Sequence, residues 1–338
     1  MDDTVKAMSS QELAKLCRQP SAAGDYSCLS GHPLILLDLL SKNTAVSAEQ
    51  YAQLGEILSR VACPVIAIAG AGSHPGLTGS VDVVVSSHNE ARVLAQNILQ
   101  HPLAAMTLVQ LLRHNEKSSR ENGLFAESLA YATLQGAQEF RNYLATRPEP
   151  PVTPDIQEPA VLLARHNDVL TLTLNRPQQR NAYSMAMRDA LLEGLQLLVH
   201  DNSITRAIIS GAGTCFCTGG ALDEFGQVDD IATAHAIRSA ASVGRLIAAV
   251  AAKVECQLHR ACIGSGIELP AFAGRVVAQP NAFFQLPEIT MGLIPGAGGT
   301  VSLLARIGRQ RLAYLALSAR RINARTALDW GLIDEIRA

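Results

Sequence analysis

Two glutamates stand beside glycine-rich segments in the last third of the chain. Gly264-Ser265-Gly266-Ile267-Glu268 joins a tight turn to a carboxylate, and Glu288 precedes a second glycine cluster at 292–300. A glycine-rich turn that opens a helix directs free backbone N–H groups and the positive end of the helix dipole at one point. Such donors stabilise a developing oxyanion, and two carboxyl groups beside them suit general acid–base chemistry. The alternative is a pair of tight turns with both glutamates on the surface.

Alternating strands and helices are predicted around these glutamates. The patterns indicate strands at 161–165, 169–174, 207–211 and 275–278, and the stretch 254–262 leads into the first glycine segment. Helices are expected at 184–200, with Ser184 as N-cap, and at 231–252. This alternation predicts an α/β fold with right-handed crossovers.

The first half of the chain predicts a separate α/β and helical domain over residues 1–146. Strands are expected at 33–39, 64–69 and 81–85, and helices at 11–18, 47–61 and 89–144, the last with breaks near Pro102 and Gly123. The segment 70–76 lacks the spacing of a dinucleotide-binding turn, so we interpret it as a loop. A proline-rich linker at 147–155 separates this domain from a catalytic core at 156–338.

Composition excludes several classes of function. The chain has 338 residues, of which 48% are apolar, and a net charge of −2. This balance gives no electrostatic basis for binding nucleic acid or an anionic membrane, and no apolar run reaches membrane-spanning length. Seven cysteines and a start without signal-peptide features indicate reduced thiols and a cytoplasmic protein. We interpret Cys215-Phe216-Cys217 as buried thiols, because one C-x-C without partner ligands is a weak metal motif.

Several segments, in order and spacing, resemble the crotonase (enoyl-CoA hydratase/isomerase) superfamily. The resemblance covers about residues 160–338 and rests on five motifs in register. They are Leu174-Asn175-Arg176-Pro177 with Asn181-Ala182; Phe216-Cys217-Thr218-Gly219-Gly220; Gly264-Ser265-Gly266-Ile267-Glu268; Pro287-Glu288-Ile289 with Gly292-Leu293-Ile294-Pro295-Gly296-Ala297-Gly298-Gly299; and Ala327 with Trp330-Gly331-Leu332-Ile333-Asp334.

The resemblance implies a ββα-repeat spiral core and an enzyme that acts on acyl-CoA thioesters. By position, the backbone N–H groups of Gly220 and Ser265 would form the oxyanion hole. Glu268 and Glu288 would be the paired carboxylates of a hydratase, with Gly296 near the attacking water. Contacts to acyl-CoA would come from Arg176, Arg180, Ala182, Gly219, Ala221 and Leu222. No cofactor beyond the CoA of the substrate, and no metal, is implied.

Some positions depart from the family pattern. Ala221 and Asp223 stand where many relatives carry Asp and a CoA-binding Lys, so Arg176 and Arg180 are the replacement candidates. Polar residues alternate through Glu255, Gln257 and His259, which either line a polar pocket or pair across the sheet. Pro270 follows Glu268 closely and is expected to shift it.

Family members continue for several helices beyond the motif that lies at 330–334 here. Those helices cover the active site and build a trimer. The segment 123–140 of this chain resembles such a tail, through Gly123-Leu124-Phe125-Ala126-Glu127-Ser128 and Gln138-Glu139-Phe140. We therefore hypothesise that the first half is a permuted crotonase-like piece that supplies the covering helices, in a homo-oligomer that is a trimer or hexamer.

Three functions fit these residues. The first is an enoyl-CoA hydratase of fatty acid metabolism, favoured because both glutamates are present. The second keeps the enolate pocket for isomerisation, C–C cleavage, decarboxylation or oxygenation. The third is a non-catalytic acyl-CoA-binding subunit, which the missing CoA lysine favours and the two like charges in an apolar cleft oppose.

Overall fold

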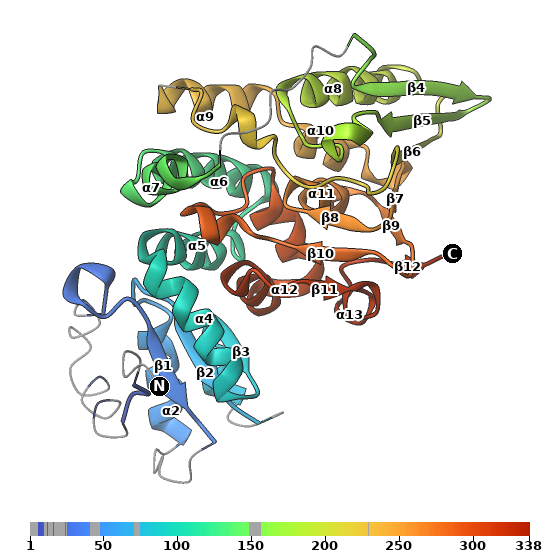
Figure 1. Cartoon of the computed structure of the whole chain (residues 1–338). Helices are drawn as coiled ribbons and strands as arrows, with labels where there is room; N and C mark the ends of the chain where they lie inside the picture. The colour runs from blue at the N-terminus through green and yellow to red at the C-terminus, as the bar shows by residue number, and fades with distance from the viewer. Residues whose placement is uncertain are drawn as a thin grey trace.

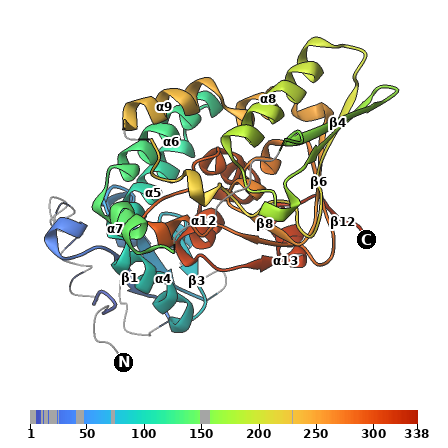
Figure 2. The same ribbon diagram turned by 45° about the horizontal axis from the view of Figure 1, so that its top comes forward.

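The computed structural model describes residues 6–9, 12, 16, 24, 26–40, 48–70, 75–148, 157–228 and 230–338. Three sheets run through this part of the chain (Figure 1). A six-stranded sheet and a three-stranded sheet form the C-terminal core, and a second three-stranded sheet stands at the N-terminal end with helices between them (Figure 1). Figure 2 gives a second view of the same arrangement.

The six-stranded sheet has the order β12-β9-β7-β6-β5-β4. Strands β4 and β5 form an antiparallel hairpin, and every other pairing in this sheet is parallel. The smaller core sheet has the order β11-β10-β8, and a bridge between Cys217 and Cys262 continues its pairing. Strand bounds are β4 Val161–His166, β5 Val169–Leu174, β6 Arg206–Gly211, β7 Val254–Leu258, β8 Ala261–Ile263, β9 Arg275–Ala278, β10 Phe283–Gln285, β11 Ile322–Asn323 and β12 Glu335–Ile336.

Helices of the core follow the strands and cover the two sheets. Ser184 caps the first of them by accepting a hydrogen bond from the Met187 N–H, as its sequence predicts. The longest helix turns through a kink at Gly308, whose φ is 77°. The bounds are α8 Met185–His200, α9 Ile231–Ala240, α10 Val243–Ala249, α11 Ser265–Glu268, α12 Gly299–Ser318 and α13 Ala324–Trp330.

The first half of the chain forms a parallel sheet, with two helices between its strands in sequence and four successive helices after it. The sheet has the order β1-β2-β3, with β1 Ile35–Asp38, β2 Val65–Ile68 and β3 Val83–Val85. The helices are α2 Ala48–Leu58, α3 Pro75–Thr78, α4 His88–Gln100, α5 Pro102–Asn115, α6 Arg120–Gln135 and α7 Gln138–Thr146. Pro102 occupies the first turn of α5, where its missing N–H costs no helical hydrogen bond.

Four sequence-based boundaries are wrong. The helix expected at 231–252 breaks at Ala241, because Ser242 caps a new helix, α10. The stretch 254–262 is two strands in different sheets, separated at Arg260, whose φ is +54°. The break expected at Gly123 lies instead before α6, and a further break separates α6 from α7. The helix predicted at 11–18 and the linker at 147–155 lie mostly outside the described residues.

The hydrophobic core joins the two halves of the chain. One continuous cluster of buried side chains runs from β2, β3 and helices α4–α7 into both sheets of the C-terminal core. A second, smaller cluster fills the other face of the N-terminal sheet. Helix α12 packs against α4, α5 and α6, and the Asn97 side chain of α4 donates to the Leu317 carbonyl of α12. Helices α4–α7 therefore pack as part of the C-terminal core, although they come from the first half of the chain.

A buried ion cluster holds the N-terminal sheet against α5 and α12. Asp82 is 1% exposed and pairs with Arg113 of α5 and with Arg309 of α12. The same carboxylate accepts a hydrogen bond of 2.9 Å from the Val65 N–H. Removing one member of a buried ionic network leaves its partners uncompensated, which destabilises proteins strongly.

We predict that Asp82→Ala lowers the free energy of unfolding by about 3–5 kcal/mol, because the buried guanidinium of Arg309 and the partly buried guanidinium of Arg113 lose their common carboxylate. Chemical denaturation would measure the change. Glu56→Ala, which removes an exposed pair with Arg60, is the control and should cost less than about 1 kcal/mol. Equal effects of the two substitutions would contradict this role of the cluster.

Candidate active site

Within the described part of the chain, two residues with free backbone N–H groups, Ser265 and Gly220, line one cavity beside the start of α11. Gly264 precedes the helix with φ 52°, and Ser265 is its first residue. Gly220 forms a parallel bridge with Tyr183. Among the described residues, no hydrogen bond is donated by the N–H of Ser265 or of Gly220. Both residues line the same cavity, so these donors are available to an oxyanion.

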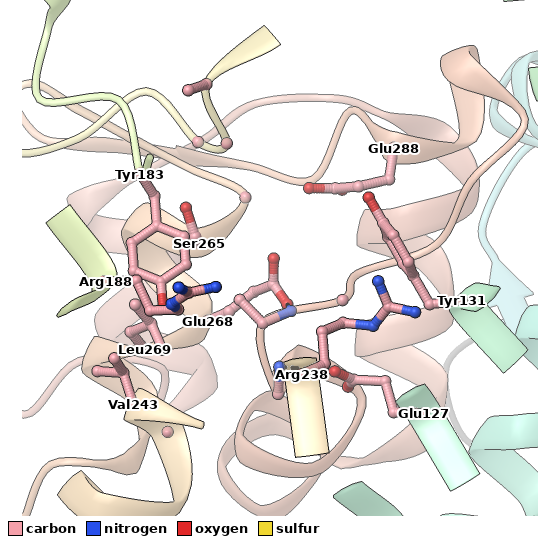
Figure 3. A pocket seen from close by; sticks show the side chains of 18 of the residues that line it. Glu127, Tyr131, Tyr183, Arg188, Arg238, Val243, Ser265, Glu268, Leu269 and Glu288 are labelled. Carbon is pink, nitrogen blue, oxygen red and sulfur yellow. Dashed lines mark hydrogen bonds between the residues drawn. The ribbon is translucent and has the colours of Figure 1, made fainter. Parts of the chain in front are cut away.

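Glu268 and Glu288 converge beside this turn. A Cβ added to Gly264 would lie 2.6 Å from Glu288 Oε1 and 3.9 Å from Glu268 Oε1, so both carboxyl groups face one point (Figure 3). Glu268 is the last residue of α11, and Glu288 opens a short 3-10 turn over Glu288–Met291. The surface alternative is therefore wrong for both carboxyl groups, since Glu268 is 2% exposed and Oε2 of Glu288 is a buried atom.

A third carboxylate, Glu127 of α6, enters the site from the first half of the chain. Its Oε1 accepts from the Gly298 N–H at 2.6 Å, and its Oε2 accepts from the Thr300 N–H at 2.8 Å. Glu268 Oε2 accepts hydrogen bonds from the N–H groups of Ala297 at 2.8 Å and Gly299 at 2.9 Å, which alternate along the chain with the two that donate to Glu127. The glycine-rich start of α12 thus binds two glutamates with four successive N–H groups, as expected of a helix N-terminus.

Burial and mutual repulsion raise the pKa values of these carboxyl groups. Burial, and then the charges of Glu288 and Glu127, hold the pKa of Glu268 well above its usual range. Burial raises the pKa of Glu288 to about 8 and that of Glu127 to about 7. Glu288 Oε2 has no hydrogen-bond partner among the described residues, which adds to its cost of ionisation. At neutral pH the cluster therefore retains protons, and it offers a general acid and a general base together.

Tyr131 of α6 completes the wall around the carboxyl groups. A Cβ on Gly296 would lie 2.4 Å from the Tyr131 ring, so only glycine fits under this side chain. Figure 3 places the phenol beside Glu288, on the opposite side of Glu268 from Ser265. Burial raises the pKa of the Tyr131 phenol, and the nearby carboxylates raise it further, so the hydroxyl stays protonated.

The cavity between these residues has a volume of about 550 Å³. Of the predicted site residues, it brings together Gly219, Gly220, Ala221, Leu222, Ser265, Glu268, Glu288 and Gly296. Arg188 of α8, Arg238 of α9 and Arg245 of α10 also line it. No local sequence pattern identified these arginines, Glu127 or Tyr131 as site residues.

Three predicted CoA contacts lie elsewhere. The cavity lining does not include Arg176, Arg180 or Ala182. Arg176 is buried, and its guanidinium donates to the backbone carbonyls of Pro159, Asn175 and Glu158. Arg180 adopts φ +52° at the end of a short turn. Assignment of the CoA phosphates to these two arginines stays a prediction.

The polar strand at 255–259 pairs across the sheet. Glu255 accepts from Arg206 and Gln257, and it lies within ion-pair distance of Arg275 and Arg337. Both alternatives therefore hold in part: Glu255 belongs to a satisfied network across the sheet, while Gln257 and His259 line a polar cavity separate from the one with the glutamates. His259 contacts the Gly213 carbonyl and does not line the cavity with the glutamates.

Two further interpretations can be compared with the structure. Cys215 and Cys217 are buried, and burial raises the pKa of both thiols. Pro270 begins a 3-10 turn directly after α11, so the helix ends at Glu268 without an internal proline. Within the described ranges, no helix is long and apolar enough to cross a bilayer.

We predict that Glu288→Gln flattens the pH dependence of stability. A buried carboxyl whose pKa rises from 4.5 to about 8 keeps its proton while the unfolded chain loses it, so its contribution to stability falls between those pH values. The free energy of unfolding of the wild type should therefore decline more steeply over that range than that of the variant. Glu193→Gln, on the exposed face of α8, is the control. Parallel profiles for wild type and Glu288→Gln would contradict the raised pKa.

The second half of the chain is similar to known proteins. Residues 164–338 match the family model described as enoyl-CoA hydratase/isomerase. The 2,3-dehydroadipyl-CoA hydratase of Escherichia coli (strain K12) is 34% identical over 176 residues, which cover 52% of this chain and 68% of that protein. The 1,2-epoxyphenylacetyl-CoA isomerase of the same organism is 32% identical over 173 residues, covering 50% and 66%.

Among solved structures, the enoyl-CoA hydratase of Thermoplasma volcanium GSS1 aligns with a TM-score of 0.50 at 30% identity. The alignment covers 54% of this chain and 73% of that one. The core therefore has the crotonase fold that the motifs predict. Together with the two glutamates beside free backbone donors, these matches establish that the chain belongs to the enoyl-CoA hydratase/isomerase family, the crotonase superfamily of enzymes.

Proposed function

We propose that the protein adds water to the double bond of a 2-enoyl-CoA thioester. The observation that carries this proposal is the convergence of Glu268 Oε1 and Glu288 Oε1 beside Gly264, next to the free N–H groups of Gly220 and Ser265. An isomerase needs one carboxyl group to move a proton between carbons. Two carboxyl groups facing one point are suited to hold a water molecule between them.

The thioester carbonyl would lie between the N–H groups of Gly220 and Ser265. Water adds to the β-carbon, and the π electrons move through the α-carbon to the thioester oxygen as an enolate. The two N–H groups stabilise this negative charge better than they stabilise the neutral carbonyl, and one such donor contributes about 3–4 kcal/mol to lowering a barrier.

The two glutamates would carry out the proton transfers of the reaction. Glu268 takes a proton from the adding water, and Glu288 delivers one to the α-carbon as the enolate collapses. The net change is the addition of H–OH across the double bond. The raised pKa of Glu288 supports its role as an acid near neutral pH, and the N–H groups of Ala297 and Gly299 hold Glu268 in a fixed orientation.

We also propose that α6 and α7 serve as the covering helices that other family members carry at the end of the chain. Tyr131 lies on Gly296, and Glu139 lies on Gly292, whose added Cβ would be 2.6 Å from the Glu139 Cβ. The active site would then need both halves of the chain. An oligomer in solution, a trimer or hexamer, remains part of this proposal.

A second candidate is an isomerase that uses Glu288 alone. It is favoured by the unpartnered Oε2 of Glu288, which is free to remove a proton, while Glu268 Oε2 is engaged by two N–H groups. Such an enzyme would move the double bond without adding water.

We predict that the purified protein adds one water to 2-enoyl-CoA and that Glu268→Gln and Glu288→Gln each lower kcat by at least about 100-fold, since each variant lacks an acid or base. Mass spectrometry of product formation with 2-enoyl- and 3-enoyl-CoA thioesters would measure this. Glu193→Gln is the matched control and should keep full activity. A shifted double bond without added water, lost only in Glu288→Gln, would support the isomerase instead.

A further inference from the structure

The guanidinium of Arg238 lines the cavity on the other side of Glu268 from Ser265 (Figure 3). Arg238 extends from α9 and lines the cavity together with Tyr131 and Glu127. In Figure 3 these three side chains lie on the far side of Glu268 from Ser265 and Tyr183. A thioester held at Gly220 and Ser265, with its double bond beside the glutamates, would extend its acyl group toward this end.

Arg238 uses only part of its hydrogen-bonding capacity. Its Nη1 donates to Gln135 Oε1 at 3.0 Å, and its Nε and Nη2 donate at 3.3 Å to the Ser128 hydroxyl and carbonyl. A guanidinium has five N–H groups, so at least two remain for a ligand. No carboxylate among the described residues lies within 4.0 Å of it as an ion pair.

The groups around Arg238 do not replace such a carboxylate. The guanidinium lies 4.8 Å from the centre of the Tyr131 ring, a cation–π contact with an uncharged partner. Glu127 is near enough to favour the charge of Arg238, but its oxygens already accept from Gly298 and Thr300. Glu268 and Glu288 lie in the same cavity and share the burial that opposes their ionisation.

Burial lowers the pKa of Arg238 from its ordinary value, because the guanidinium has lost part of its water. A partly desolvated arginine without a direct counter-ion favours a ligand that brings a negative charge and accepts two parallel hydrogen bonds. A carboxylate has both properties, whereas an alkyl chain would leave the two N–H groups unsatisfied.

We infer that the acyl group of the substrate carries a carboxylate, and that Arg238 binds it at the end of the cavity beyond the glutamates. This inference rests on the proposed function, because the position of the thioester defines which end receives the acyl group. It makes Arg238 a specificity-determining residue, and the preferred substrates are thioesters of dicarboxylic acids.

A purely structural role for Arg238 makes a different prediction. Its bonds to Ser128 and Gln135 connect α9 to α6, so a structural role would alter stability and affect all substrates alike. Discrimination between two acyl groups of equal length would not change. The comparison below therefore measures selectivity and not activity alone.

The experiment compares two 2-enoyl-CoA thioesters of equal chain length, one ending in a carboxylate and one in a methyl group. We expect the wild type to prefer the carboxylate by about 10- to 100-fold in kcat/KM, and Arg238→Met to lose that preference, because a charge-assisted bidentate contact is removed. Arg238→Lys should keep part of it. Arg245→Met, in a lining arginine already paired with Glu121, is the control and should affect both substrates equally.

A second measurement makes the inference independent of turnover. The ligands are the saturated counterparts of the two thioesters, titrated calorimetrically into the Glu288→Gln variant. The thioester that ends in a carboxylate should bind more tightly than the one that ends in a methyl group. This difference should vanish in the double variant that also carries Arg238→Met. If the protein shows this binding preference but does not add water to 2-enoyl-CoA, the proposed function is contradicted and the inference about Arg238 is not. Equal affinities, or a preference for the methyl-ended thioester that Arg238→Met leaves unchanged, would overturn the inference about Arg238.

Discussion

The active site depends on how the backbone at the start of α12 is hydrogen-bonded. Four successive N–H groups, from Ala297 to Thr300, would be unsatisfied at a buried helix N-terminus without acceptors. Glu268 and Glu127 supply them alternately, one from the core and the other from α6 in the first half of the chain. This one set of bonds fixes Glu268, orders the glycine-rich segment and attaches α6 to the core.

The same arrangement explains the electrostatics of the site. Two carboxylates on one helix N-terminus receive charge-stabilising hydrogen bonds, yet they are buried beside Glu288, so the pKa values of all three rise. A cluster that retains protons near neutral pH is suited to deliver one and accept another. Arg238 supplies positive charge at the far end of the cavity, where it opposes the repulsion among the carboxyl groups and is free to bind an anion.

The segments that line the candidate site could be located from the sequence because their conformation depends on local backbone. Gly264 needs φ +52°, Gly296 needs the space under Tyr131, and Glu268 is three residues from Ser265. Local signals also explain two boundaries that were missed. Ser242 before Val243 is an N-cap, and the polar pair His259-Arg260 permits the left-handed turn that separates β7 from β8.

Other features follow from tertiary packing and had no local signal. Gly123 looked like a helix break but lies inside α6, because a Cβ there would meet Val301 of α12 at 2.9 Å. Glu127 and Arg238 had the character of ordinary surface residues of amphipathic helices. Their place in the site depends on α6 and α9 meeting over α12, through contacts between residues more than a hundred positions apart. Arg176 matched a family motif, yet three backbone carbonyls bind its guanidinium.

The most direct test is the effect of Glu127→Gln on catalysis, because this residue lies outside the part of the chain that matches the family. The amide of glutamine has only one acceptor oxygen, so its NH2 group would face one of the two backbone N–H groups that donate to Glu127. Two donors cannot pair, so the glycine-rich segment and Glu268 should shift. We predict a loss of kcat of at least about tenfold in a folded protein, with Glu121→Gln on the same helix retaining activity. Full activity of a folded Glu127→Gln protein would contradict the claim that the two halves of the chain build one active site.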